Sequence, residues 1–179
     1  MDERLPQLLM CRELDIAPLD PYVSCDFLVR PATTDDEPGI AGVLTDAFND
    51  AWSVDRVARE LTRRCDVDTV FVAEADVKIV GTASARLGTH LIPGAGYVHW
   101  VATAGGYRGR GVARALCAAV LRRFQELGCR SVVLETDDAR TEAVRLYWRL
   151  GFRPLSRHPM DGTRWDAVLA ACDLCDREE

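Results

Sequence analysis

Apolar positions in the second half of the chain repeat at the spacing of α-helices. Five of them mark one face of a long helix that ends at Gly128: Val112, Leu116, Val120, Phe124 and Leu127. Residues 131–136 form a short, mostly apolar run that is typical of a buried strand. Residues 141–150 return to helical spacing and end at Gly151. The pattern predicts a helix, a strand and a helix in succession.

The first half of the chain combines two helix starts with runs rich in β-branched residues. A capping box at 34–37 and a capping serine, Ser53, each precede a helical pattern. Strands are predicted at 27–30, 69–74, 78–87, 96–103, 152–156 and 164–170, with a hairpin between the second and third. The order β-α-α-β-β-β-α-β-α-β-β predicts one α/β domain, with a mixed central sheet and helices on both faces.

The two ends of the chain have weaker patterns. Residues 1–26 contain three prolines and no sustained periodicity, so we expect an N-terminal extension there. The domain is then expected at 27–171, with a C-terminal tail at 172–179. The N-terminal sequence does not resemble a signal peptide, and no apolar run approaches the roughly 20 residues that span a bilayer. We therefore expect a cytoplasmic protein that is not associated with a membrane.

Charge and cysteine content argue against nucleic-acid binding, a disulfide framework and a zinc site. The formal net charge of −6 disfavours a nucleic-acid-binding protein, which is usually basic. Seven cysteines, an odd number, do not suggest a disulfide framework. Cys172 and Cys175 form a lone C-x-x-C pair with no second pair and no nearby histidine. Zinc sites usually need four such ligands, so we expect no metal.

The segment GGYRGRGVARAL, residues 105–116, contains four glycines and three arginines where a strand meets the long helix. A glycine-rich turn at a helix N-terminus directs backbone N–H groups and the positive end of the helix dipole towards one point. Such a turn favours a phosphate or pyrophosphate. The segment lacks the Gly-Lys of a P-loop, and Arg114 stands where a dinucleotide-binding turn has its third glycine. A nicotinamide-dependent oxidoreductase is therefore disfavoured.

Two motifs resemble those of the GNAT superfamily of N-acetyltransferases. Residues 108–113, RGRGVA, match the pattern R/Q-x-x-G-x-G/A of its coenzyme A pyrophosphate loop. Residues 143–152, AVRLYWRLGF, match its helix motif A-x-x-L-Y-x-x-x-G-F. The predicted strand order is also similar from about residue 27 to 171. The resemblance implies an acetyl-CoA-dependent N-acetyltransferase whose sheet is splayed between its fourth and fifth strands.

The resemblance also implies roles for individual residues. The pyrophosphate would bind the backbone amides of Gly109, Arg110, Gly111, Val112, Ala113 and Arg114, with the side chains of Arg108 and Arg110 at its edge. The pantetheine arm would pair with the backbone of Val101, Ala102 and Thr103, and an N–H of that strand would stabilise an oxyanion. Arg140 replaces an asparagine that is common in the family, and it would reach the phosphates, the acceptor or only solvent.

Transfer to an amine needs a general base and a general acid. Tyr147 occupies the position of the family's tyrosine that protonates the thiolate; without the motif it would be a core residue. Glu135 is the preferred base. It lies opposite the face shared by Val132 and Leu134, although a structural role is the alternative. His99, on the strand at 96–103, is the second candidate base, since the unperturbed pKa of histidine is roughly 6.5.

The acceptor is the least specified part of the prediction. We expect the acceptor to be a primary amine on a small molecule or a protein. The protein itself is expected to be a monomer or a homodimer. Acidic residues along the first two predicted helices suit a cationic acceptor, and they equally suit ordinary solvated helix faces: Asp35, Asp36, Glu37, Asp46, Asp50 and Asp55. The alternative function is a non-catalytic domain that senses acyl-CoA or serves as a scaffold.

Overall fold

The computed structural model describes residues 5–14, 26–88 and 91–174. The chain divides into two compact units, Leu14–Val132 and a second unit made of Met1–Glu13 with Val133–Glu179. Each unit is described by itself below. Among the described residues, no helix is both long enough and apolar enough to cross a membrane.

The larger unit is built on four antiparallel strands in the order β2-β3-β4-β5. Their bounds are β2 Leu28–Pro31, β3 Val67–Ala75, β4 Lys78–Arg86 and β5 Gly96–Thr103. All four agree with strands predicted from the sequence, and β5 agrees to the residue. β3 and β4 form the predicted hairpin, whose turn residues Asp76 and Val77 both have positive φ.

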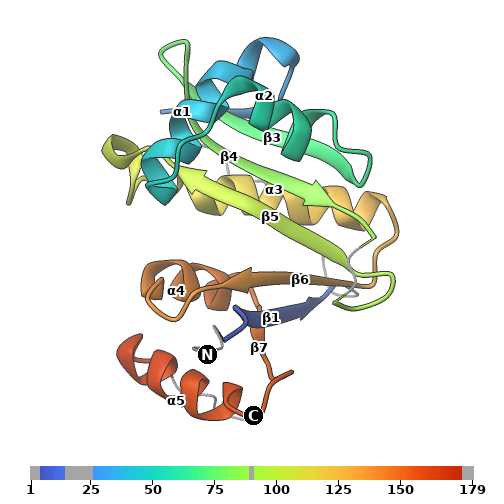
Figure 1. The fold of residues 1–179 in the computed structure, drawn as a ribbon, viewed down its shortest axis with the longest axis vertical. Coiled ribbons are helices and arrows are strands. Elements are labelled where there is room, and N and C mark those ends of the chain that lie inside the picture. The colour runs from blue at the N-terminus through green and yellow to red at the C-terminus, as the bar shows by residue number, and fades with distance from the viewer. Residues whose placement is uncertain (1–4, 15–25, 89–90, 175–179) are drawn as a thin grey trace. The chain divides into compact units, whose positions relative to one another are not determined.

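Helices cover both faces of this sheet (Figure 1). They are η1 Thr34–Asp36, α1 Glu37–Phe48, α2 Val54–Val57, the π-helical turn η2 Ala58–Thr62, η3 Gly105–Tyr107 and α3 Val112–Glu126. The α1 side holds an apolar cluster that includes Ile40 and Leu44 with Val72 of β3. On the α3 side, a Cβ on Gly96 would come within 2.5 Å of the Phe124 ring. Glycine at this position therefore allows α3 to pack closely on β5.

The smaller unit contains three strands and two helices. The strands follow the order β6-β1-β7, with β1 Leu8–Glu13 antiparallel to β7 Arg153–Leu155; β6 is Ser131–Thr136. The helices are α4 Thr141–Arg149 and α5 Asp161–Ala171. β6, β7 and α4 confirm the sequence predictions at 131–136, 152–156 and 141–150.

Two sequence predictions about the smaller unit differ from the structure. The strand predicted at 164–170 is wrong, because these residues belong to α5. Its buried residues Trp165, Val168, Leu169 and Cys172 follow the i, i+3, i+4, i+7 spacing of a helix. The N-terminal extension expected at residues 1–26 was assigned no strand from its sequence, yet Leu8, Leu9 and Met10 are buried in β1. The boundaries 1–26, 27–171 and 172–179 stay a prediction, and Cys175 lies outside the described residues.

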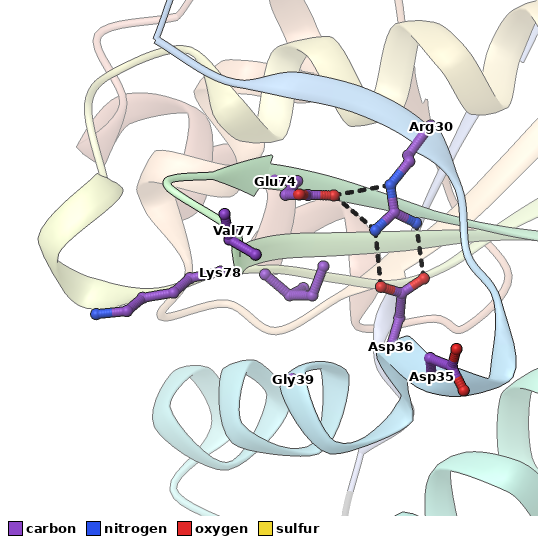
Figure 2. A pocket seen from close by; sticks show the side chains of 8 residues that line it. Arg30, Asp35, Asp36, Gly39, Glu74, Val77 and Lys78 are labelled. Atoms are coloured by element: carbon purple, nitrogen blue, oxygen red, sulfur yellow. Dashed lines mark hydrogen bonds and ion pairs between the residues drawn. The ribbon is translucent and has the colours of Figure 1, made fainter.

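An ion-pair cluster ties the edge strand β2 to β3 and to the start of α1 (Figure 2). The Arg30 guanidinium donates to both carboxylate oxygens of Asp36 at 2.7 and 2.8 Å, and to Glu74 at 2.6 and 2.8 Å. Asp36 also accepts from the Thr33 N–H at 2.7 Å. The Arg30 guanidinium and the Thr33 donors lower the Asp36 pKa to about 2. These side chains line an open pocket of about 510 Å³.

Replacing Arg30 by methionine is expected to lower the free energy of unfolding by about 1–3 kcal/mol at pH 7, because two carboxylates lose a charged donor. An unfolded aspartate has a pKa of roughly 3.9, so the contribution of Asp36 is complete above that pH and disappears as the pH falls towards 2. Urea unfolding at pH 7 and pH 3 measures this. The exposed pair Arg59–Glu60 supplies the control variant Arg59→Met. Equal losses in the two variants would contradict a specific role for Arg30.

Candidate coenzyme-binding turn and proton-transfer residues

The turn between β5 and α3 has a backbone shape that requires glycine. Gly109 and Gly111 have φ values of +75° and +84°, in the left-handed region that other residues adopt at a cost. The turn starts from a fixed point, because the Ala104 N–H donates to the Val80 carbonyl at 2.9 Å. The glycine of the sequence motif R-x-x-G-x-A is Gly111, and it thus corresponds to a specific left-handed backbone conformation.

The N-terminus of α3 is open to an anion. Gly111 precedes the helix without a side-chain cap, and the Ala115 N–H donates to the Gly111 carbonyl at 3.0 Å. The N–H groups at residues 112–114 have no acceptor within the helix, and they lie at its positive end. Arg108 and Arg110 are exposed, and within the described residues neither forms an ion pair. The turn therefore presents backbone donors together with the two exposed guanidinium groups of Arg108 and Arg110, which form no ion pair with the described residues.

β5 contains a bulge at Trp100 and Val101, close to its C-terminal end. Ser84 pairs with His99 and Thr82 with Ala102, so Trp100 and Val101 together oppose one residue of β4. Trp100 has a φ of +50°, a strained conformation for a bulky residue that costs roughly 1–3 kcal/mol. A bulge leaves backbone groups out of the strand ladder. The N–H groups of this stretch are thus candidates for contacts with a ligand.

The bulge also changes which residues share a face. The Trp100 ring packs edge-on against Phe48 and Trp52 of the α1 side, at 5.1 and 4.7 Å between ring centres. Ala102 belongs to the same apolar cluster. Simple alternation along a regular strand would put Val101 on the same face as His99, and the extra residue at the bulge breaks that alternation. Thr103, the last residue of β5, is half-buried, and its hydroxyl has no partner among the described residues.

His99 lies in surroundings that disfavour its protonated form. Burial, together with the positive charges of Arg86 and Arg64, lowers the His99 pKa to about 3. Its ring packs between Tyr97 and Trp100, each at 5.2 Å between centres, and Nδ1 is buried with no partner within the described residues. The imidazole is therefore neutral at pH 7, and in these surroundings it is a poor proton acceptor.

Glu135 of β6 is mostly buried, with 19% of its side chain exposed, and it is paired with Arg157. The same guanidinium nitrogen of Arg157 donates to the Gln7 carbonyl at 2.9 Å. The three residues before Glu135 are fully buried, so the carboxylate is carried by a rigid part of the unit. Glu135 thus has the partner that a carboxylate in an apolar strand needs, and a role as base has to be compatible with that pair.

Tyr147 is held by the end of α4. It is 7% exposed, and its ring meets Phe152 edge-on at 6.0 Å between centres. The Phe152 N–H donates to the Tyr147 carbonyl at 3.0 Å, and Gly151 between them has a φ of +84°. This is a helix end closed by a left-handed glycine and an apolar contact. The Gly-Phe of the helix motif therefore fixes the position of the tyrosine one turn earlier.

Arg140 stands immediately before α4 and pairs with a neighbour in sequence. Its Nε donates to Asp137 at 3.0 Å, and its carbonyl accepts from the N–H groups of Ala143 and Val144 at 3.0 and 3.1 Å. Arg140 thus orders the start of α4 through its backbone. Its predicted contact with phosphates or an acceptor stays a prediction.

The model of the acetyltransferase (GNAT) family matches residues 38–152, well over half of the chain. The chain belongs to the GNAT family. The match includes the turn after β5, β6 and the whole helix motif ending at Phe152.

Curated relatives have a higher sequence identity to this GNAT chain than the solved structures do, but over shorter stretches. The N-alpha-acetyltransferase MAK3 of Arabidopsis thaliana is 37% identical over 82 residues, which are 46% of this chain and 43% of that protein. A mycothiol acetyltransferase of Pseudarthrobacter chlorophenolicus is 41% identical over 81 residues, 45% of this chain and 21% of that protein. The alignments thus span less than half of each relative.

Solved structures confirm the predicted mixed α/β GNAT fold. A GCN5-related N-acetyltransferase from Sphaerobacter thermophilus matches with a TM-score of 0.67 and 24% identity, over 84% of this chain and 50% of that one. The aminoglycoside N-acetyltransferase AAC(6')-Iy, in complex with CoA, matches with a TM-score of 0.65 and 23% identity, over 78% of this chain and 95% of that one. At these identities the likeness concerns the fold.

Sequence reasoning missed two contacts that bear on the GNAT motifs. Asp46 of α1 accepts a hydrogen bond from the Gly105 N–H at 2.7 Å, just before the turn. Arg157, on the segment between β7 and α5, pairs with Glu135. Asp46 was noted only as one of several acidic residues, and no local pattern marks Arg157. Both contacts join residues far apart in sequence, 59 and 22 positions, which a single sequence does not reveal.

Proposed function

We propose that this GNAT chain is an N-acyltransferase that moves an acetyl group from acetyl-CoA directly to a primary amine. The observation that carries the proposal is the uncapped start of α3 behind two left-handed glycines, next to two exposed arginines. Backbone donors, a helix dipole and exposed guanidinium groups together suit a pyrophosphate. The GNAT structure AAC(6')-Iy contains CoA, which supports the same choice of ligand.

The reaction assigns one proton transfer to each of two residues. Acetyl-CoA supplies a thioester, in which attack by the amine forms a C–N bond and breaks the C–S bond. Glu135 is proposed to remove a proton from the amine, and Tyr147 to donate its hydroxyl proton to the departing thiolate. A phenol, with an unperturbed pKa of roughly 10, suits a thiolate leaving group. The backbone of Val101, Ala102 and Thr103 is proposed to hold the pantetheine arm beside the bulge.

The acceptor is proposed as a primary amine on a small molecule or a protein. The curated relatives are named N-alpha-acetyltransferase and mycothiol acetyltransferase, which supports an amine-directed reaction without choosing between the two kinds of acceptor. The oligomeric state, the cytoplasmic location, the absence of a metal and the absence of nucleic-acid or membrane partners stay predictions from the sequence.

The coenzyme proposal is tested by calorimetric titration of the protein with acetyl-CoA, CoA and NAD. We expect saturable binding of acetyl-CoA and CoA and no heat from NAD. Replacing Arg108 and Arg110 together by glutamine should weaken acetyl-CoA binding roughly 5- to 30-fold, because each exposed charge contributes about 0.5–1 kcal/mol. The effect should shrink in high salt. The control is Arg59→Gln, which removes an exposed arginine from η2.

Two outcomes would contradict the proposal. The first is a folded protein that does not bind CoA, which would have the GNAT fold but not the coenzyme-binding function. A protein that binds acetyl-CoA but releases no thiol with any amine in an acceptor screen would be the non-catalytic sensor. Thiol release that depends on both acetyl-CoA and an amine would confirm the transferase.

A further inference from the structure

Asp46 is an acidic residue at an electrostatically unfavourable place. It lies in the last turn of α1, where the helix dipole is negative and where α1 has no basic residue. A carboxylate there is disfavoured by a few tenths of a kcal/mol or more. The side chain is exposed, so burial of apolar surface does not explain it either. A specific contact is therefore needed to explain an aspartate at this position.

That contact is with the backbone that leads into the coenzyme-binding turn. The Asp46 Oδ2 accepts from the Gly105 N–H at 2.7 Å, a short, charge-assisted bond between α1 and η3. Gly105 is followed by Gly106, both are exposed, and a Cβ on Gly106 would meet nothing within 4 Å. Two adjacent exposed glycines have a large conformational freedom to lose. The carboxylate therefore adds a side-chain restraint to a segment that is otherwise held by backbone hydrogen bonds, from the Ala104 N–H to Val80 and from the Tyr107 N–H to Ala104, both at 2.9 Å.

The same turn of α1 also contacts the segment after the helix and the bulge in β5. The Thr45 hydroxyl accepts from the Trp52 N–H at 3.0 Å, and Phe48 packs on Trp100 at 5.1 Å. Because α1 is anchored at these points, Asp46 presents its carboxylate from a fixed position. The hydrogen bond from Gly105 to Asp46 thus holds the backbone to the rigid helix α1 at a point five residues before Arg110.

We propose that Asp46 is a positioning residue for coenzyme binding, and this rests on the proposed function. It holds Gly105 so that the turn at 108–114 is already in its ligand-binding shape, which reduces the entropy lost on binding. The carboxylate itself carries the wrong charge for a phosphate ligand. Its benefit therefore comes from the hydrogen bond to Gly105, and the two effects can be separated by substitution.

The test is the dissociation constant for CoA, measured by calorimetry together with Tm. Asp46→Ala removes the acceptor, and we expect binding to weaken roughly tenfold. Asp46→Asn keeps an oxygen acceptor and removes the charge, so its affinity should lie closer to that of the wild type than to that of Asp46→Ala. Asp55→Ala removes an exposed carboxylate from α2 and controls for net charge.

A fourth variant separates positioning from plain stability. Adding Gly106→Ala to Asp46→Ala stiffens the same backbone by another route, and part of the lost affinity should return. A merely structural role would lower Tm and the fraction of binding-competent protein while leaving the dissociation constant unchanged.

The possible outcomes distinguish failure of the proposed function from failure of this inference about Asp46. Absence of CoA binding by the folded wild type overturns the proposed function and this inference together. Wild-type binding with an unchanged dissociation constant in Asp46→Ala overturns the inference alone. So does tighter binding in both Asp46→Ala and Asp46→Asn, which would mean that the carboxylate acts only through its charge.

Discussion

Replacing Tyr147 by phenylalanine is expected to lower kcat roughly 10²- to 10⁴-fold and to leave the affinity for acetyl-CoA nearly unchanged. The hydroxyl is the group proposed to protonate the thiolate, and phenylalanine removes it alone. The ring is 7% exposed and packs on Phe152, contacts that phenylalanine keeps. The loss should therefore appear in the chemical step, while Tm changes little.

Single-turnover thiol release, with the dissociation constant for acetyl-CoA measured in parallel, checks this expectation. Tyr97→Phe on β5 is the matched control, since it removes the hydroxyl of a tyrosine that packs against His99. An unchanged kcat in Tyr147→Phe would make Tyr147 a packing residue at the end of α4. A fall in kcat accompanied by a large fall in Tm would also contradict the assignment.

The parts of the fold that sequence predicts best are those with a local cause. Helix α4 ends at a left-handed glycine followed by an apolar residue, and both are visible as Gly151 and Phe152. Strand β5 is predicted to the residue because glycine and threonine bound a run of β-forming residues. The glycine-rich turn was predicted from its composition, and Gly109 and Gly111 adopt positive φ in it, while its ligand stays a prediction.

The failures arise where the local signal was weak or ambiguous. α5 was read as a strand, since its β-branched and aromatic residues outweighed the helical spacing of Trp165, Val168 and Leu169. β1 is a short apolar run among prolines, and it is stabilised by pairing with β7 about 145 residues later. The bulge at Trp100 leaves no mark in the sequence, although it decides which face Val101 occupies. Such features depend on tertiary contacts.

The candidate site divides in the same way. The coenzyme-binding turn and Tyr147 lie in motifs, so they could be proposed from sequence alone. The ties that hold site residues, Asp46 to Gly105 and Arg157 to Glu135, come from the folded chain. His99 was a reasonable base on the strand, and only its burial and the nearby arginines explain why its pKa falls to about 3.

Glu135→Gln is expected to lower kcat/KM roughly 10²- to 10⁴-fold, because glutamine cannot accept the amine proton. Its carboxamide oxygen can still accept from Arg157, so the local structure should persist. Arg157→Gln is the control for the structural alternative. If Glu135 serves only to hold Arg157, both variants should lose the same stability and the same activity.

The pH dependence of kcat/KM distinguishes Glu135 from His99. His99 is neutral throughout the range above its pKa of about 3, so a base that titrates between pH 5 and 8 is not His99. His99→Gln should therefore keep both the activity and the acidic limb of the profile, whereas Glu135→Gln should lose activity at every pH. The opposite result would make His99 the base and would require that acetyl-CoA or the acceptor reverse the effect of burial on its pKa. Full activity of both variants would mean that neither residue is the base.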